Sequence, residues 1–185
     1  TLVKENYTVA LYNQVDSTSS ELKDHILFKI YSPSTHLDNE MSNNMLMCII
    51  VNEYKCIITS NIIHSLHISY IDLSTGKNYL TELYDISNVQ NEINKYITSI
   101  NPSEIISNIH IETNILCHNI NCNKTFNNIN YQEHYLNKLF KNDSIISIFQ
   151  YLDLHNKPDL IYSYIHLLEF AYSHDQTIIY KINKP

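Results

Sequence analysis

Four carboxylates could do metal-dependent chemistry if the fold brought them together. Asp72 closes one apolar run, and its candidate partners are Glu82, Glu104 and Asp159. Carboxylates that converge from strand ends can hold two metal ions in a nuclease. Their spacing brings no three of them to one point, and Glu104, just after Pro102, is expected to be exposed. A metal-dependent nuclease of ribonuclease-H type therefore stays an alternative, and Asp72 more simply stabilises a turn.

Thiols and imidazoles form the second group with chemical potential. Cys117 and His118, followed by Cys122 and preceded by His110, have a spacing similar to that of zinc ligands. Structural zinc needs four ligands, usually in two short-spaced pairs, and no second pair matches. Cys48 lies in an apolar run and is expected in the core. We predict no catalytic, metal-binding or cofactor-binding residue, and keep a small zinc-stabilised interaction module as a second alternative.

The sequence Ser74-Thr75-Gly76-Lys77 resembles the end of a phosphate-binding loop. It lacks that loop's first glycine, the Ser or Thr after lysine, and the helix that should follow. Gly76 is the only glycine among 185 residues and separates two β-rich runs, residues 66–73 and 77–84. We therefore predict that Gly76 is the structural residue of a hairpin turn that requires a positive φ.

Composition and charge restrict the partners of the chain. It has 29 Ile, 24 Asn and 15 Tyr but no Trp, its 12 basic residues are all Lys, and its net charge is −7. Because Arg is the usual bidentate ligand of phosphate and guanine, an acidic chain without it is poorly suited to bind nucleic acid alone. No apolar run approaches the ~20 residues that span a bilayer. With no targeting segment recognised, we expect an intracellular, soluble piece of a longer protein.

Periodicity predicts the elements that position these residues. Residues 45–51 form a continuous apolar run, typical of a strand buried on both faces. Apolar side chains recur at helical spacing between Ile86 and Ile100, Pro102 ends that helix, and residues 105–109 return as a strand. Residues 52–65 either extend a hairpin or form an insertion. The predicted fold class is α/β, a ribonuclease-H-like mixed sheet flanked by helices.

The two ends of the chain have patterns of their own. Residues 1–16 read as the end of a helix and a strand (7–12), and residues 26–31 as a second strand; together they are too few to enclose a core. We predict a short α+β remnant of a preceding domain. Residues 111–128 are expected to be a surface loop, 131–140 and 158–172 helices, and 178–182 an exit, while 144–152 fit either a helix or a strand.

Five motifs in this order resemble the MutS family of DNA mismatch repair proteins. Residues 2–15 are similar to its helix that gives way to a strand ending in Glu-Gln, and residues 28–35 to its strand ending in Thr-Pro-Gly-Thr. Residues 43–46 resemble its Asn-Asn-Tyr-Leu, 70–76 its Asp-hydrophobe-Ser-Thr-Gly hairpin, and 101–106 its Pro-Ser/Ala-Glu strand. Two departures are Ser34 in place of the family's glycine and a longer stretch at 52–65.

The resemblance implies a domain layout. Residues 1–42 would be the C-terminal part of the mismatch-binding domain and a linker, 43–180 the connector domain, and 181–185 the exit toward the lever domain. It implies a non-catalytic fragment, without a cofactor, of a dimeric, DNA-dependent ATPase that uses ATP and Mg. A MutL-like partner would dock near residues 131–140, where His134 and Tyr135 match exposed positions. The AT-rich residue usage and residues 167–170 resemble the group from giant DNA viruses and octocoral mitochondria.

Overall fold

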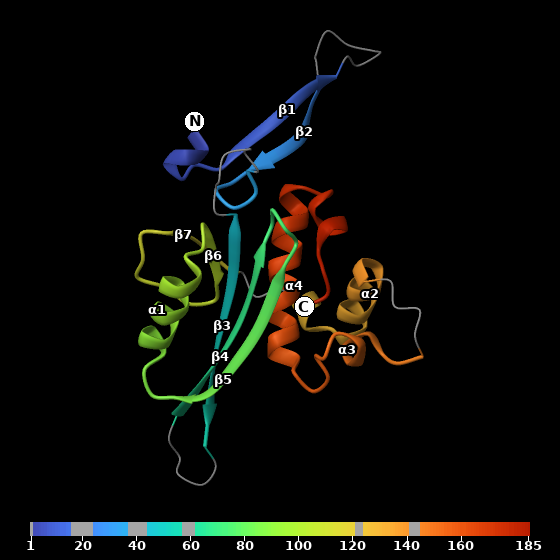
Figure 1. Cartoon of the computed structure of the whole chain (residues 1–185). Coiled ribbons are helices and arrows are strands. Elements are labelled where there is room, and N and C mark those ends of the chain that lie inside the picture. Colours follow the sequence, from blue (N-terminus) through green and yellow to red (C-terminus); the bar gives the residue numbers. More distant parts are fainter. Residues whose placement is uncertain (1, 16–23, 37–43, 57–61, 121–123, 141–144) are drawn as a thin grey trace.

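The chain forms a five-stranded mixed sheet with helices on both faces, preceded by a separate two-stranded sheet (Figure 1). This computed structural model describes residues 2–15, 24–36, 44–56, 62–120, 124–140 and 145–185. The strands are β1 (Val9–Val15), β2 (Asp24–Tyr31), β3 (Met45–Lys55), β4 (Ile62–Asp72), β5 (Asn78–Ile86), β6 (Glu104–Ser107) and β7 (Leu116–Asn119). The helices are α1 (Val89–Ile100), α2 (Ile129–Phe140), α3 (Ile148–Tyr151) and α4 (Pro158–His174), with 3-10 turns η1 (Leu2–Glu5), η2 (Lys124–Asn127) and η3 (Ile178–Lys181).

The large sheet has the order β5-β4-β3-β6-β7. β3 and β4 pair antiparallel, as do β4 and β5, because short hairpin connections join them. β6 then pairs parallel to β3, and β7 parallel to β6, after α1 has carried the chain across one face. The predicted α/β class, a ribonuclease-H-like mixed sheet with flanking helices, is confirmed.

Each face of the sheet has its own core, and β3 contributes to both. Its even-numbered residues Leu46, Cys48 and Ile50 pack toward α4, whereas Met47 and Ile49 pack toward α1. All five are at most 2% exposed. Successive side chains of a strand point to opposite faces, so a run without polar interruption marks a strand covered on both sides.

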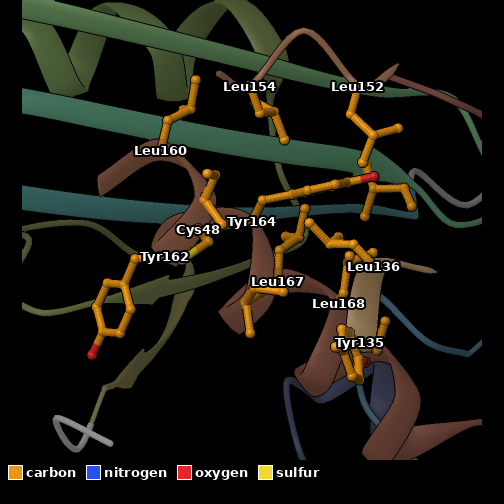
Figure 2. Packing of buried hydrophobic residues seen from close by; sticks show 14 of the residues in the cluster. Cys48, Tyr135, Leu136, Leu152, Leu154, Leu160, Tyr162, Tyr164, Leu167 and Leu168 are labelled. Atoms are coloured by element: carbon orange, nitrogen blue, oxygen red, sulfur yellow. The ribbon is translucent and has the colours of Figure 1, made fainter. Parts of the chain in front are cut away.

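Helix α4 fills the larger core, between the sheet and the α2–α3 layer (Figure 1). Ten of its 17 residues are buried, and its apolar side chains cover most of its circumference. A helix that is apolar nearly all round must be enclosed by protein. Figure 2 shows Tyr164 lying among leucines from α2, α4 and the segment that follows α3.

Several local predictions need correction. Residues 111–128 are not entirely loop, because Leu116–Asn119 add β7 to the sheet edge. In the stretch 52–65, the described residues extend the β3–β4 hairpin, with Lys55 opposite Ile62, while 57–61 lie outside the described residues. Within 144–152, residues 148–151 are helical. No helix among the described residues is long and apolar enough to cross a membrane.

Candidate functional site

Two joints lie at one end of the large sheet, the end from which the β1–β2 hairpin projects (Figure 1). β3 and β6 both begin there and β4 ends there, since Leu46 is opposite Glu104 and Met45 is opposite Asp72. The entry joint holds the entry segment, residues 32–35, which leads from β2 toward the large sheet. The exit joint holds the exit segment, residues 181–183, which leads away from it.

The entry joint is built around the side chain of Glu104, which is 0% exposed. Its Oε2 accepts hydrogen bonds from Ser32 Oγ (2.7 Å), from Ser34 N (3.1 Å) and from Ser34 Oγ (2.5 Å). Its Oε1 accepts one from His118 Nε2 at 2.6 Å. The expectation that Glu104 is exposed is therefore wrong: the segment after β2 folds over the start of β6 and covers the carboxylate.

These bonds keep the buried carboxylate charged. Burial by itself raises the pKa of Glu104, because it disfavours the charged form. The hydrogen bonds from His118, Ser34 and Ser32 outweigh burial and hold the pKa below its ordinary value. A charged acceptor makes stronger hydrogen bonds than a neutral one, so the entry segment is held by polar bonds directed at one group.

An aromatic stack supports the entry joint from β7 and α4. The His118 ring lies 4.9 Å, centroid to centroid, from the ring of Phe170, which stacks on His174 at 4.2 Å. His174 Nδ1 in turn bonds the carbonyl of Phe170 at 2.8 Å. β7 thus places His118 against Glu104, a contact that its Asn-rich sequence did not indicate.

The exit joint starts from the turn between β4 and β5. Asp72 Oδ1 accepts from Ser74 N at 2.9 Å, and Asp72 Oδ2 accepts from Thr75 Oγ1 at 2.7 Å. The Gly76 N–H closes the turn onto the carbonyl of Asp72 at 2.7 Å, and Gly76 has a φ of +75°. Asp72 is therefore committed to the turn, and burial, which raises its pKa, is outweighed by the Ser74 and Thr75 hydrogen bonds that lower it.

The last residues of the chain pack directly on this turn. Asn183 N donates to the carbonyl of Gly76 at 2.9 Å, and Asn183 Nδ2 donates to the carbonyl of Thr75 at 3.2 Å. A Cβ on Gly76 would stand 1.9 Å from the carbonyl oxygen of Lys181. Gly76 is therefore required by a close approach as well as by its φ, and the sequence pattern indicated only the second reason.

Asn78 connects the exit joint to the core. Its Nδ2 donates to the carbonyl of Asn183 at 2.5 Å, and its Oδ1 accepts from the hydroxyl of Tyr164 at 3.0 Å. Asn78 is 5% exposed and Tyr164 is 0% exposed. The exit segment is thus tied through one amide to a fully buried residue of α4.

The four candidate nuclease acids are not gathered at one point, although Asp159 lies 3.7 Å from His67 Nε2 and Glu82 is opposite His67 in the β4–β5 pair. Asp72 and Glu104 serve the two joints, while Asp159 accepts from the hydroxyl of Tyr54 at 2.5 Å and Glu82 lies 3.6 Å from Lys157 Nζ. Across the part of the chain that the structure describes, no three His, Cys, Asp or Glu side chains are grouped to hold a metal ion.

The candidate zinc ligands have other surroundings. Cys117 is exposed on β7, and His118 bonds Glu104 instead of pointing toward Cys117's thiol. Cys122 lies outside the described residues. Cys48 is fully buried between the sheet and α4, as expected, and burial raises the pKa of its thiol to about 12.

For the predicted partner-contact pair on α2, the expected exposure of Tyr135 needs correction. His134 is exposed, but Tyr135 is only 9% exposed, and its ring stacks on Tyr131 with centroids 5.9 Å apart. Burial raises the pKa of Tyr135 far above its ordinary value. Tyr135 therefore belongs to the packing between α2 and α4, and His134 alone is presented to solvent.

Comparison with known proteins gives one consistent result. No family model matches the chain. It is 31% identical over 113 residues to the DNA mismatch repair protein MutS of Lachnoclostridium phytofermentans, covering 58% of this chain and 11% of that protein. It is 27% identical over 122 residues to MutS of Staphylococcus aureus, covering 62% of this chain and 12% of that protein.

The chain therefore spans about a tenth of the length of the curated relatives it matches. These relatives are bacterial, and they give no support to the predicted link with giant viruses or octocoral mitochondria. The resemblance to MutS that the five motifs indicated is confirmed, whereas the predicted origin is not. This chain is similar to a portion of the DNA mismatch repair protein MutS.

Proposed function

We propose that this chain is the non-catalytic connector of a MutS-type mismatch repair protein, joining a mismatch-binding module to lever and ATPase modules. The observation that carries the proposal is the position of the two joints. Glu104 holds the entering segment and Gly76 receives the leaving segment, both at the same end of one sheet. In this proposal residues 1–42, 43–180 and 181–185 keep the domain roles implied by the resemblance.

A body with this construction suits mechanical connection. Its central strands β3 and β4 pair over 11 residues, and both faces of the sheet are covered by apolar cores. Densely packed cores resist deformation and transmit displacement. Two neighbours attached at one end of such a block would change their mutual orientation only if a joint moved.

The polar groups of the joints also support a role without catalysis. The carboxylates of Glu104 and Asp72, one in each joint, accept hydrogen bonds from serine, threonine or histidine donors on both of their oxygens. In this proposal ATP and Mg are bound elsewhere in the full-length dimer, and DNA contacts come mainly from the module before residue 43.

The decisive experiment places Glu104→Gln in the full-length protein and measures ATP hydrolysis with and without mismatched DNA. If the entry joint transmits the DNA-bound state, basal hydrolysis stays within about two-fold while its response to the mismatch falls about ten-fold or more, because several hydrogen bonds of the joint are lost. Glu112→Gln, at an exposed position, is the matched control. An unchanged mismatch response in Glu104→Gln would contradict the connector role.

The 185-residue chain alone provides a second test. Its net charge of −7 and lack of Arg predict weak DNA binding. That binding should fall further as salt rises from about 50 to about 200 mM, since each phosphate contact releases counterions. Binding measured by fluorescence anisotropy should not distinguish mismatched from paired duplex. Tight, mismatch-selective binding by this chain would contradict the proposal.

We also propose the outer face of α2 as the docking surface for a MutL-like partner. His134 is exposed there beside a shallow hollow of about 610 Å³, whose lining includes Asn128, Asn130 and Tyr131. His134→Asp in the full-length protein should weaken capture of that partner in a pull-down or biosensor assay. Glu112→Gln is again the control, and equal capture by both variants would place the docking surface elsewhere.

A further inference from the structure

Asp175 lies between the entering hairpin and the leaving segment. It follows α4 directly, and its backbone N–H closes the helix onto the carbonyl of Ala171. Its carboxylate has two oxygens that face two different parts of the chain, one in β2 and one in the turn toward η3.

The first oxygen binds the hairpin. Asp175 Oδ2 lies 2.6 Å from Lys29 Nζ on β2, and the two side chains are 11% and 30% exposed. The ammonium group of Lys29 also lies 5.3 Å from the centroid of the Tyr31 ring. The pair bridges a cleft of about 430 Å³ lined by residues 27–30 and 173–177.

The second oxygen shapes the exit. Asp175 Oδ1 accepts from Thr177 N at 2.9 Å and from Thr177 Oγ1 at 2.7 Å. The backbone N–H of Ile178 then bonds the carbonyl of Asp175 at 3.1 Å and begins η3. Because η3 ends at Lys181, whose carbonyl abuts Gly76, the turn at Asp175 sets how the last residues meet the exit joint.

We propose that Asp175 is a coupling residue, through which the position of the β1–β2 hairpin biases the exit segment directly, without passing through the sheet. The path is continuous: Lys29, the carboxylate of Asp175, Thr177, η3, and Asn183 on the β4–β5 turn. When the ion pair breaks, the Asp175 side chain loses one of its two anchors, so the turn it caps is less restrained. Such coupling acts in both directions.

The charge state of Asp175 agrees with this role. Burial alone raises its pKa, but the hydrogen bonds from Lys29 and Thr177 lower it more, so the carboxylate remains ionised near neutral pH. The proposal deepens the connector role and would give it a route from entry to exit. Its test uses neither DNA nor ATP, so it can fail while the connector role stands.

The test is amide hydrogen exchange on the 185-residue chain. Lys29→Met should raise exchange at the amides of Thr177, Ile178 and Asn183 by about two- to five-fold, the range expected for a partly exposed ion pair. Amides of β3 and β4 should keep their protection. Asp175→Asn keeps an Oδ1 acceptor for Thr177 but removes the charge, so it should resemble Lys29→Met, and the double variant should add little to either.

The matched control is Lys95→Met, which removes another ion pair of 2.6 Å, to Glu92 on α1. It should leave the exit amides unchanged. Salt at about 1 M, which shortens the screening length to about 3 Å, should raise wild-type exchange only part of the way to the Lys29→Met level, because a partly buried contact pair is screened less than an exposed one. In the reverse direction, Asn183→Ala should raise exchange in β2. Unchanged exit amides in Lys29→Met, or equal acceleration throughout β3 and β4, would overturn the proposal.

Discussion

The two joints at the end of the sheet use opposite chemistry. The entry joint is a buried carboxylate, Glu104, surrounded by hydroxyl, amide and imidazole donors. The exit joint is a glycine turn, Gly76, on which the main chain of the last residues lies, with backbone bonds at its centre. One joint recognises its segment by charge and the other by shape.

This difference separates two kinds of sensitivity. A charged acceptor can be titrated, and its loss leaves several buried donors without a partner. The central bond of the exit joint, from Asn183 N to the carbonyl of Gly76, joins two backbone groups that do not titrate. That joint instead tolerates no added atom where Gly76 approaches the carbonyl of Lys181. Each joint can therefore be impaired by a change that leaves the other intact.

Removing the carboxylate of the entry joint should have the largest effect on stability. Glu104→Gln keeps the shape of the side chain, but its amide nitrogen cannot accept from Ser32 or Ser34. We expect the free energy of unfolding in urea to fall by about 3 kcal/mol, because buried donors lose a charged acceptor. Glu112→Gln, at an exposed site, should change it by less than about 0.5 kcal/mol. A Glu104→Gln variant as stable as the control would show that the charge is not what holds the segment.

Adding one methyl group to the exit joint should have the next largest effect. In Gly76→Ala the new Cβ would meet the carbonyl oxygen of Lys181 at 1.9 Å, on a backbone with φ of +75°. We expect a loss of about 2 kcal/mol, since a non-glycine residue in this conformation is strained and the exit segment must also shift. Thermal or urea unfolding measures the loss, and exchange at the Asn183 amide measures the shift.

Position 85 separates strain from contact. Asp85 also has a positive φ, 55°, but it is exposed and lies at the far end of β5 from the turn. Because aspartate already carries a Cβ, the comparison uses two variants, and Asp85→Ala should be less stable than Asp85→Gly by only the conformational part, about 1 kcal/mol. A loss in Gly76→Ala no larger than this difference would mean that the approach of Lys181 contributes nothing.

Acid should weaken the entry joint through Glu104, whereas the bond at the centre of the exit joint, from Asn183 N to the carbonyl of Gly76, has no group that titrates. The pKa of Glu104 is below its ordinary value of 4.5 in the folded chain. A carboxylate with a depressed folded pKa stabilises the fold fully above the unfolded pKa and loses this contribution as pH falls through the folded one. The difference in unfolding free energy between wild type and Glu104→Gln should therefore shrink below about pH 4.5, whereas that for Gly76→Ala should not. Parallel behaviour of the two variants would remove the distinction between the joints.

The sequence predicted the parts of this structure that have a period. The continuous apolar run of β3, the alternation in β4, the helical spacing of α1 and the apolar stripe of α4 each depend on many residues, so the α/β sheet and its flanking helices could be predicted. Gly76 could also be recognised, because a lone glycine between two strands has a local explanation. These signals are properties of neighbouring residues.

The joints could not be predicted, because their residues are distant in the chain. Glu104 is buried only because Ser32 and Ser34, about 70 residues earlier, fold over it. β7 has four residues and, among the described strands, pairs with β6 alone. Its alternation is therefore too short to distinguish from a loop. Tyr135 matched a surface position by resemblance, yet its ring stacks in the α2 layer. In each case a contact between distant parts of the chain decides whether the side chain is buried, and no local sequence pattern indicates that contact.

The smallest expected effect tests whether the exit joint is tied to the core. Tyr164→Phe removes only the hydroxyl that donates to Asn78 Oδ1 at 3.0 Å and leaves the ring in the α4 core. The loss in unfolding free energy should be about 1 kcal/mol, the usual value for one buried neutral hydrogen bond. Asn78 would then be freer to turn, so exchange at the Asn183 amide should rise by more than exchange in β6. Tyr84→Phe, which removes an exposed hydroxyl 3.1 Å from Glu82, should change neither quantity measurably. Equal acceleration of exchange at the Glu104 and Asn183 amides in Tyr164→Phe would mean that the two joints open together as one cooperative unit. The joints would then differ in their construction, by charge and by shape, but not in their stability toward opening.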